Sequence, residues 1–203
     1  MLKIRCIRKC IYKGKVFKPG QITDIDGSFS KDCFTYLNRP PVELSLPKCS
    51  GSVTLLGDGP SLQYALDNPE KIKTPVAAVN RVGVKWPLKL DYWISLHTYW
   101  LAFANSWRKK TGHTMDGLRF ISNRVPLKPD VIRSPDHFKS GGGSGLYAAE
   151  TLELMGFNHI HIIGIDLTGR YEWFRPAWKP ENFKIKITAH CGFLKELFEK
   201  ENE

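Results

Sequence analysis

Two glycine-rich turns are the residues in this sequence that most clearly could do chemistry. The first is Gly57-Asp58-Gly59-Pro60-Ser61, which follows the apolar run SVTLLG. The second runs from Gly141 to Gly145 and opens an apolar helical pattern. Unpaired N–H groups at a helix N-terminus bind phosphate or carboxylate, and glycine lets the anion approach without meeting a Cβ. Both turns therefore predict anion sites, although a tight turn that packs a helix closely would use the same glycines.

Three histidines lie near the elements that these turns connect. His97 follows the apolar segment DYWISL, and a neutral imidazole there could act as a general base or simply cap a strand. His159 and His161 alternate along HIHIIGID, so they share one face of a strand. We expect a structural role for that pair.

Apolar runs alternate with helical patterns from residue 50 onward. Strands that are apolar on both faces and alternate with helices indicate an α/β domain with a Rossmann-like, mainly parallel sheet flanked by helices. Ligands bind such sheets outside the carboxyl ends of the strands, where both turns fall. Neither turn matches the P-loop or the dinucleotide fingerprint. Strands are expected at 52–57, 75–80, 91–97, 118–122, 130–134 and 159–166, and helices at 58–70, 144–157 and 190–203.

Residues 1–49 are predicted to form a separate, small basic β module before the Rossmann-like domain of residues 50–203. Residues 1–50 carry 10 Lys and Arg against 4 Asp and Glu, in a chain of net charge +10. We expect a strand over 2–12 with Cys6 and Cys10 on one side, then a hairpin at Lys13-Gly14. Nucleic acid or a protein could dock on the basic module, and a solvated strand face is the plainer interpretation.

The five cysteines and the absence of an export signal favour free thiols. Their spacings match no familiar zinc knuckle, so no metal site is expected. No apolar run approaches the roughly 20 residues that span a bilayer. We therefore expect a cytoplasmic protein with no membrane span.

Three segments, LLGDGPSL, VAAVNRV and GSGLYAAETLELMGFNHIHIIGIDLTG, together resemble the bacterial family-42 sialyltransferases. They are also similar to motility-accessory-factor proteins, to archaeal hydroxymethylpterin diphosphokinases and to uncharacterised phage and prophage proteins. The resemblance spans residues 52–169. It implies a nucleotide site formed by Gly57, Asp58, Gly59, Pro60, Ser61, Asn80, Gly143, Ser144, Gly145 and Asp166.

The resemblance also implies that His190, just before the last helix, serves as the general base, with His97 as the other candidate. The segment after Asp166 is short for a full lid, and Asp58 stands where the sialyltransferases usually have Asn. Aromatic and basic side chains of that segment could stack on a base or sugar and neutralise phosphate, or they could pack on the core. The substrate or lid candidates are Arg170, Tyr171, Trp173, Arg175 and Trp178.

The expected function is a glycosyltransferase-like enzyme, phage or prophage encoded, that uses a nucleotide-sugar donor such as a CMP-sugar and requires no metal cofactor. One alternative is a Mg²⁺-dependent diphosphotransferase, in which Asp58 and Asp166 would hold the metal. The other is a non-catalytic phage protein that binds nucleotide or has a structural role and docks through its basic N-terminal module. The acceptor is not predicted.

Overall fold

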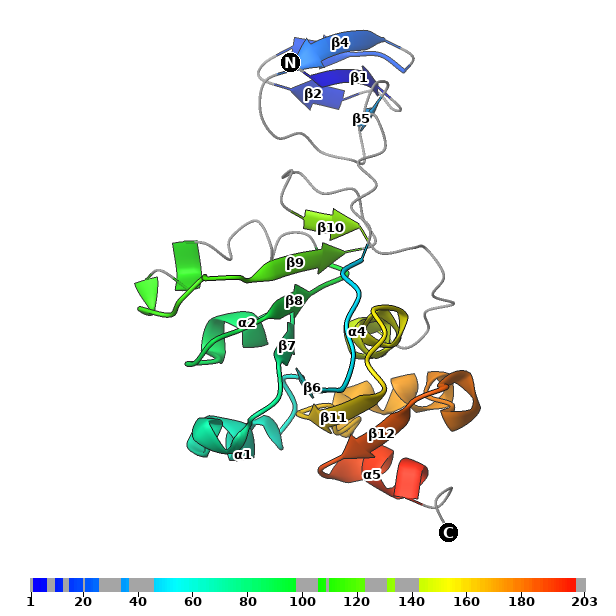
Figure 1. Cartoon of the computed structure of the whole chain (residues 1–203). Coiled ribbons are helices and arrows are strands. Elements are labelled where there is room, and N and C mark those ends of the chain that lie inside the picture. The colour runs from blue at the N-terminus through cyan, green and yellow to red at the C-terminus, as the bar shows by residue number, and fades with distance from the viewer. Residues whose placement is uncertain are drawn as a thin grey trace. The chain divides into compact units, whose positions relative to one another are not determined.

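The computed structural model describes residues 2–6, 10–12, 15–19, 21–25, 34–36, 46–97, 106–108, 110–122, 131–133 and 143–199. The chain divides into two compact units, Met1–Glu43 and Leu44–Glu203 (Figure 1). No helix in the described part of the chain is long and apolar enough to cross a membrane.

The first unit is built from short antiparallel strands. Strand β1 (Leu2–Cys6) lies between β4 (Ile22–Ile25) and β5 (Phe34–Tyr36), while β2 (Cys10–Tyr12) pairs with β3 (Lys15–Phe17). Tyr12 pairs with Lys15, as the predicted hairpin requires. The prediction of one strand over 2–12 is wrong. Cys6 ends β1 and Cys10 begins β2, and the two strands have different partners in different sheets.

The second unit is an α/β domain with a seven-stranded sheet in which every neighbouring pair is parallel, as expected of a Rossmann-like fold. The strand order is β10-β9-β8-β7-β6-β11-β12. The direction of winding reverses between β6 and β11, so the topological switch point lies between these two strands. The strands are β6 Ser52–Leu56, β7 Val76–Val79, β8 Tyr92–Ile94, β9 Arg119–Ser122, β10 Val131–Arg133, β11 His159–Ile163 and β12 Lys186–Ala189.

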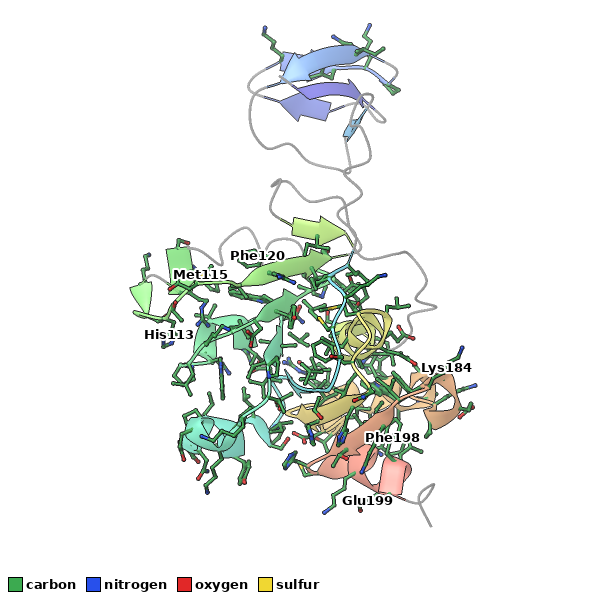
Figure 2. The ribbon with its side chains drawn as sticks, viewed as in Figure 1. His113, Met115, Phe120, Lys184, Phe198 and Glu199 are labelled. Atoms are coloured by element: carbon green, nitrogen blue, oxygen red, sulfur yellow. The ribbon has the colours of Figure 1, made fainter. Side chains whose placement is uncertain are left out.

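Side chains of successive strand residues enter two separate apolar clusters, one on each face of the sheet. On β7, for example, Ala77 and Val79 belong to the cluster beneath α4 (Gly143–Leu154) and α5 (Gly192–Glu199). Val76 and Ala78 belong to the cluster beneath α1 (Leu62–Asp67) and α2 (Val82–Lys85). Figure 2 shows both layers, with Phe120 in the second cluster and Phe198 in the first. This two-sided burial explains why the strands are apolar at nearly every position.

Three 3₁₀ segments connect the regular elements: η1 Pro69–Lys71, η2 Gly169–Ala177 and η3 Pro180–Asn182. The strand β12, the helix α2 and η2 were not expected from the sequence. Helix α1 begins at Leu62 with Ser61 as its N-cap, so Pro60, which lies within the predicted helix 58–70, precedes the observed helix.

The second unit begins before the predicted boundary at residue 49. Leu46 and Cys49 pack against the cluster beneath α4. The backbone N–H of Cys49 donates to the carbonyl of Met155 at 2.6 Å, and its Sγ lies 3.3 Å from the hydroxyl of Tyr92. The segment that leads into β6 is therefore part of this domain.

Candidate functional site at the switch point

The glycines of the first turn bring the loop after β6 against the loop after β11. The N–H of Gly57 donates to Ile163 O at 2.8 Å, and that of Gly59 donates to Gly164 O at 2.6 Å. A Cβ on Gly59 would lie 2.5 Å from the carboxylate of Asp166, and one on Gly57 would overlap the backbone of Gly164. Contact between two loops therefore accounts for Gly57 and Gly59.

Asp166 occupies the place at the start of α1 where a ligand anion could otherwise bind. Its side chain is 5% exposed and accepts hydrogen bonds from Ser61 N at 2.9 Å, Ser61 Oγ at 2.6 Å and Cys191 Sγ at 2.7 Å. The Ser61 hydroxyl in turn accepts from Gly164 N at 2.7 Å. Burial and the hydrogen bond to Asp166 raise the pKa of the Cys191 thiol, which suits a neutral donor. These contacts make Asp166 a linker of three loops.

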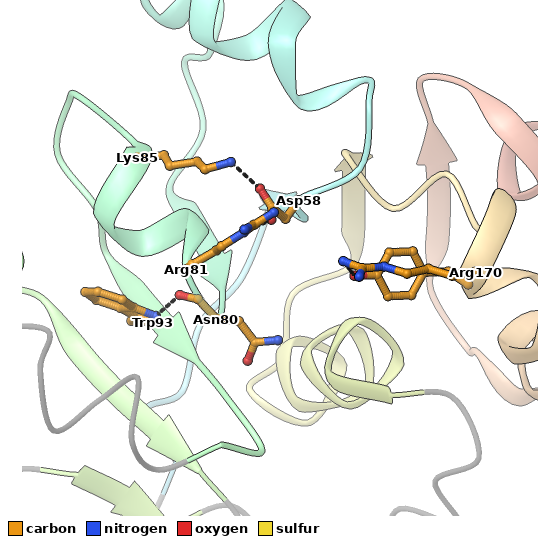
Figure 3. Close-up of polar contacts among 7 residues, drawn as sticks. Asp58, Asn80, Arg81, Lys85, Trp93 and Arg170 are labelled. Atoms are coloured by element: carbon orange, nitrogen blue, oxygen red, sulfur yellow. Dashed lines mark hydrogen bonds and ion pairs between the residues drawn. The ribbon is translucent and has the colours of Figure 1, made fainter.

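Asp58, in contrast to the buried Asp166, is partly exposed and is paired with two cationic side chains. Its carboxylate accepts from Arg81 Nε and from Lys85 Nζ, the latter at 2.6 Å, and the three side chains meet beyond the ends of β6 and β7 (Figure 3). The Arg81 and Lys85 side chains are 51% and 43% exposed. Neither was identified from the sequence, where the only signal was two basic residues four apart just after Asn80.

Asn80 directly follows β7 and lies in the left-handed backbone region, with φ of 51°, which Asn tolerates better than most residues. Its carbonyl accepts from Trp93 Nε1 and its Oδ1 accepts from Ser95 Oγ, both at 2.6 Å. Ser95 Oγ also accepts from His97 N at 2.9 Å. Within the described residues Asn80 Nδ2 bonds to no acceptor, and it points toward the side from which Arg170 approaches (Figure 3). It is a fixed, available donor.

The second turn packs the start of α4 against the segment after β11. Gly143 has φ of +68°, and a Cβ there would lie 2.9 Å from the ring of Phe174. A Cβ on Gly145 would lie 3.1 Å from Ile165 and 3.6 Å from Trp178. Ser144, between them, is buried. Gly141 and Gly142, the remainder of the predicted anion cradle, lie outside the described residues.

The predicted lid residues divide into exposed and structural groups. Arg170 stacks over the Tyr171 ring at 4.9 Å and donates to its hydroxyl at 2.8 Å. Trp173 is 67% exposed and stacks on Phe174 with ring centroids 3.6 Å apart. These side chains form an aromatic, basic surface on η2.

The other two lid residues hold η2 in place. Arg175 donates to Leu167 O at 2.9 Å and lies over Phe193. Trp178 is 2% exposed and belongs to the core beneath α4, and its indole N–H has no hydrogen-bond partner among the described residues. Arg175 and Trp178 therefore pack on the core, which was one of the two roles expected for this segment from the sequence.

The two candidate bases follow different strands. His190 comes directly after β12, is exposed, and stacks on Tyr64 of α1 with centroids 5.8 Å apart. Its backbone N–H donates to Ile162 O at 3.0 Å. His97 lies after β8, is exposed, and is joined to Asn80 through Ser95. Both are therefore at carboxyl ends of sheet strands.

Burial shifts the pKa values of two histidines on β11 and of one glutamate on α4. His159 and His161 lie 4.0 Å apart between ring centroids, and His159 Nε2 is 3.0 Å from Thr188 Oγ1. Burial, together with nearby cationic groups, lowers the pKa of both imidazoles. On α4, burial first and Glu153 second raise the pKa of Glu150 to about 7. The Oε2 of Glu150 is buried and has no hydrogen-bond partner in the part of the chain that the structure describes.

The described part of the chain contains no group of three or more His, Cys, Asp or Glu side chains that could hold a metal ion. In comparisons with known proteins, no family model matches the sequence, and no curated protein or solved structure is significantly similar to it. The resemblance to sialyltransferases thus stays a prediction from the sequence segments.

Proposed function

We propose that the second unit is the nucleotide-binding domain of a glycosyltransferase-like enzyme that transfers a sugar from a nucleotide donor. The observation that carries the proposal is the available Asn80 amide at the carboxyl edge of the sheet, next to the switch point. Ligands of open α/β sheets bind at this place. The ordered Ser95 and Trp93 contacts preorganise that amide for a ligand.

The donor would lie between Asn80 and the exposed surface of η2. Arg170 is placed to neutralise phosphate, and Tyr171 and Trp173 offer rings on which a base or sugar can stack. Gly143, Ser144 and Gly145 open α4, whose N-terminal N–H groups favour an anion. Ser61 and Asp166 would hold the loops after β6 and β11 together next to this site, through the two hydrogen bonds that join them.

The reaction would be direct transfer. An acceptor hydroxyl attacks the anomeric carbon while His190 or His97 takes its proton. The bond between that carbon and the donor phosphate oxygen breaks, and the nucleotide leaves with the electron pair. Arg170 and the Asn80 amide would stabilise the charge on the departing phosphate.

The diphosphotransferase alternative would need Asp58 and Asp166 as Mg²⁺ ligands. Asp166 is bound by Ser61 and Cys191, and Asp58 by Arg81 and Lys85. Recruiting either carboxylate to a metal would break these contacts, so glycosyl transfer is the better-supported reaction. A non-catalytic nucleotide-binding protein is the second candidate, because the closed first turn leaves fewer groups for catalysis.

The test is calorimetry of the full chain with CMP, CDP, UDP, GDP and ATP, each with and without Mg²⁺. Asn80→Asp keeps the acceptor for Ser95 but removes the amide donor and adds a charge, so it should weaken nucleotide binding about tenfold or more. Asn182→Asp adds the same charge on exposed η3 and should change little.

Four outcomes are informative. Metal-independent binding that Asn80→Asp abolishes supports the site, and nucleotide release that needs His190 or His97 supports transfer. Binding without any turnover of nucleotide sugars favours the non-catalytic candidate. If no nucleotide binds the intact chain, the proposed function is wrong.

A further inference from the structure

Arg81 and Lys85 form a charge cluster with Asp58 that was not predicted from the sequence. Both extend from the α2 segment to one carboxylate, that of Asp58, at the end of the neighbouring strand (Figure 3). Two cations share one anion, so the cluster keeps one positive charge. Asp166, the other carboxylate of this edge, is buried and bonded to Ser61, and among the described residues it forms no ion pair with Arg81 or Lys85.

Stability alone does not account for this cluster. The two cationic side chains are about half exposed, and exposed ion pairs contribute only about 0–1 kcal/mol. These charges also lie at the carboxyl ends of the strands, where ligands of open α/β sheets bind. Asp58 is in the turn after β6, and Arg81 follows Asn80 after β7. Arg170 of η2, drawn in the same view, carries another positive charge (Figure 3).

We infer that Arg81 and Lys85 are a diphosphate-binding pair, so that the ligand of the switch point is a nucleoside diphosphate or a diphosphate-linked sugar. The inference rests on the proposed function and narrows it, because a CMP-linked donor carries one phosphate at this place. Asp58 holds the two cations together at the edge of the sheet and competes with the ligand for them. Phosphate oxygens then replace the Asp58 carboxylate on the exposed side of the pair.

The test begins with inorganic pyrophosphate and inorganic phosphate, titrated into the full chain at low ionic strength with EDTA present. CMP and CDP follow under the same conditions. Pyrophosphate should bind more tightly than phosphate, and CDP more tightly than CMP. Raising the salt concentration should weaken all four, because the charges are exposed.

Three variants separate the cluster from general charge effects. Arg81→Gln and Lys85→Gln should each weaken pyrophosphate and CDP about three- to tenfold and shrink the preference for CDP over CMP. Asp58→Asn should strengthen pyrophosphate binding about threefold, because it removes the competing carboxylate. Lys195→Gln, an exposed helical lysine that also has an ion-pair partner, should leave all affinities unchanged. Melting temperatures check that each variant is folded.

The outcomes distinguish this inference from the proposed function. If nucleotides bind but the Arg81 and Lys85 variants bind CDP as the parent does, the diphosphate pair is wrong and the nucleotide site stands. If pyrophosphate binding depends on the pair but CDP binds no better than pyrophosphate, the pair stands and the nucleotide function fails. If none of the four probes binds, both are overturned.

Discussion

Asp58 and Asp166 follow adjacent strands of the sheet, yet their surroundings are opposite. Asp166 is buried and accepts three hydrogen bonds, whereas Asp58 is partly exposed and faces two cations. A carboxylate at a helix N-terminus is favourable because of the helix dipole and the unpaired N–H groups. The same residue type therefore closes the start of α1 in one place and organises a charged surface in the other.

Asp166→Asn should destabilise the second unit by about 2–4 kcal/mol, because an amide offers one acceptor oxygen to three buried or partly buried donors. Urea unfolding followed by tryptophan fluorescence measures this loss. Asp67→Asn, which changes an exposed carboxylate bonded to Gln63, should cost less than about 1 kcal/mol. Equal losses in the two variants would contradict the role given to Asp166.

Glu150→Gln should stabilise the protein at high pH and not at low pH. The folded-state pKa of about 7 is raised above the ordinary 4.5. The Glu150 carboxyl therefore costs no stability below pH 4.5, and this cost grows as the pH rises toward 7. At pH 8 the variant should be more stable by about 1–2 kcal/mol, and near pH 4.5 the difference should vanish.

Unfolding free energies at the two pH values check this expectation, with Glu196→Gln on the exposed side of α5 as the control. A pH-independent difference for Glu150→Gln would show that the carboxyl is not perturbed by burial.

At the residue scale, the predicted strand ends located the glycine turns, Asn80 and Asp166 at the carboxyl edge of the sheet. The sequence did not predict which residues they contact. The bond between Ser61 and Asp166 joins residues 105 apart, and no local pattern reports such a contact. Arg81 and Lys85 were missed for the same reason, since their significance comes from Asp58 on another strand.

At the scale of elements, β11 combines a core face with a polar face. Ile160 and Ile162 enter the cluster beneath α4, while His159 and His161 lie on the other side near Thr188 and Lys186. Helices α1 and α2 cover apolar residues further along that second face, among them Ile163 at the end of β11. The histidine pair thus lies beyond the second apolar cluster.

His161→Gln should reduce the acid sensitivity of the fold. The folded-state pKa values of His159 and His161 are lowered, so the unfolded chain binds protons more readily. Their contribution to stability is full above the unfolded value of 6.5 and is lost as the pH falls below it. The charged groups facing His161 are His159, His190 and Lys186.

Unfolding measurements from pH 7.5 to pH 5 test this, in a Glu150→Gln background so that the opposite effect of that carboxyl is absent. The parent should lose more stability on acidification than the His161 variant. Identical slopes would exclude the histidine pair as the cause.

The strands from β6 to β11 were predicted from their apolar runs, whereas β12, α2 and η2 were not predicted. The central strands β6 and β7 are apolar on both faces, which is a clear signal. Strand β12 alternates exposed and buried residues over only four positions, and α2 has a single turn. Patterns this short also occur in loops, so they do not predict a strand or a helix.

At the scale of the molecule, the division into two units places Leu46 and Cys49 with the Rossmann-like domain. The boundary was predicted near residue 49 because a proline-rich stretch precedes it. The contacts of Cys49 with Met155 and Tyr92 join distant parts of the chain, so they could not be predicted from composition. The domain boundary is therefore set by packing.

A chain starting at residue 44 should be more stable than one starting at residue 50, by about 1–3 kcal/mol. The shorter chain loses the burial of Leu46 and Cys49 and the hydrogen bond to Met155. Thermal unfolding of the two fragments, monitored by circular dichroism, measures the difference. Equal melting temperatures would place the boundary at 49 after all.

The pairing of β6 with β11 has a consequence for biosynthesis. Strand β6 is completed at Leu56, but its partner ends at Ile163, about 100 residues later. At about 5–20 residues per second, a ribosome needs roughly 5–20 s to make the intervening chain. During that time Val53 and Leu55 of β6 lack one of the two strands that flank it in the folded sheet. We therefore expect nascent chains that stop before β11 to be bound by chaperones, and release to require synthesis of the last quarter of the protein.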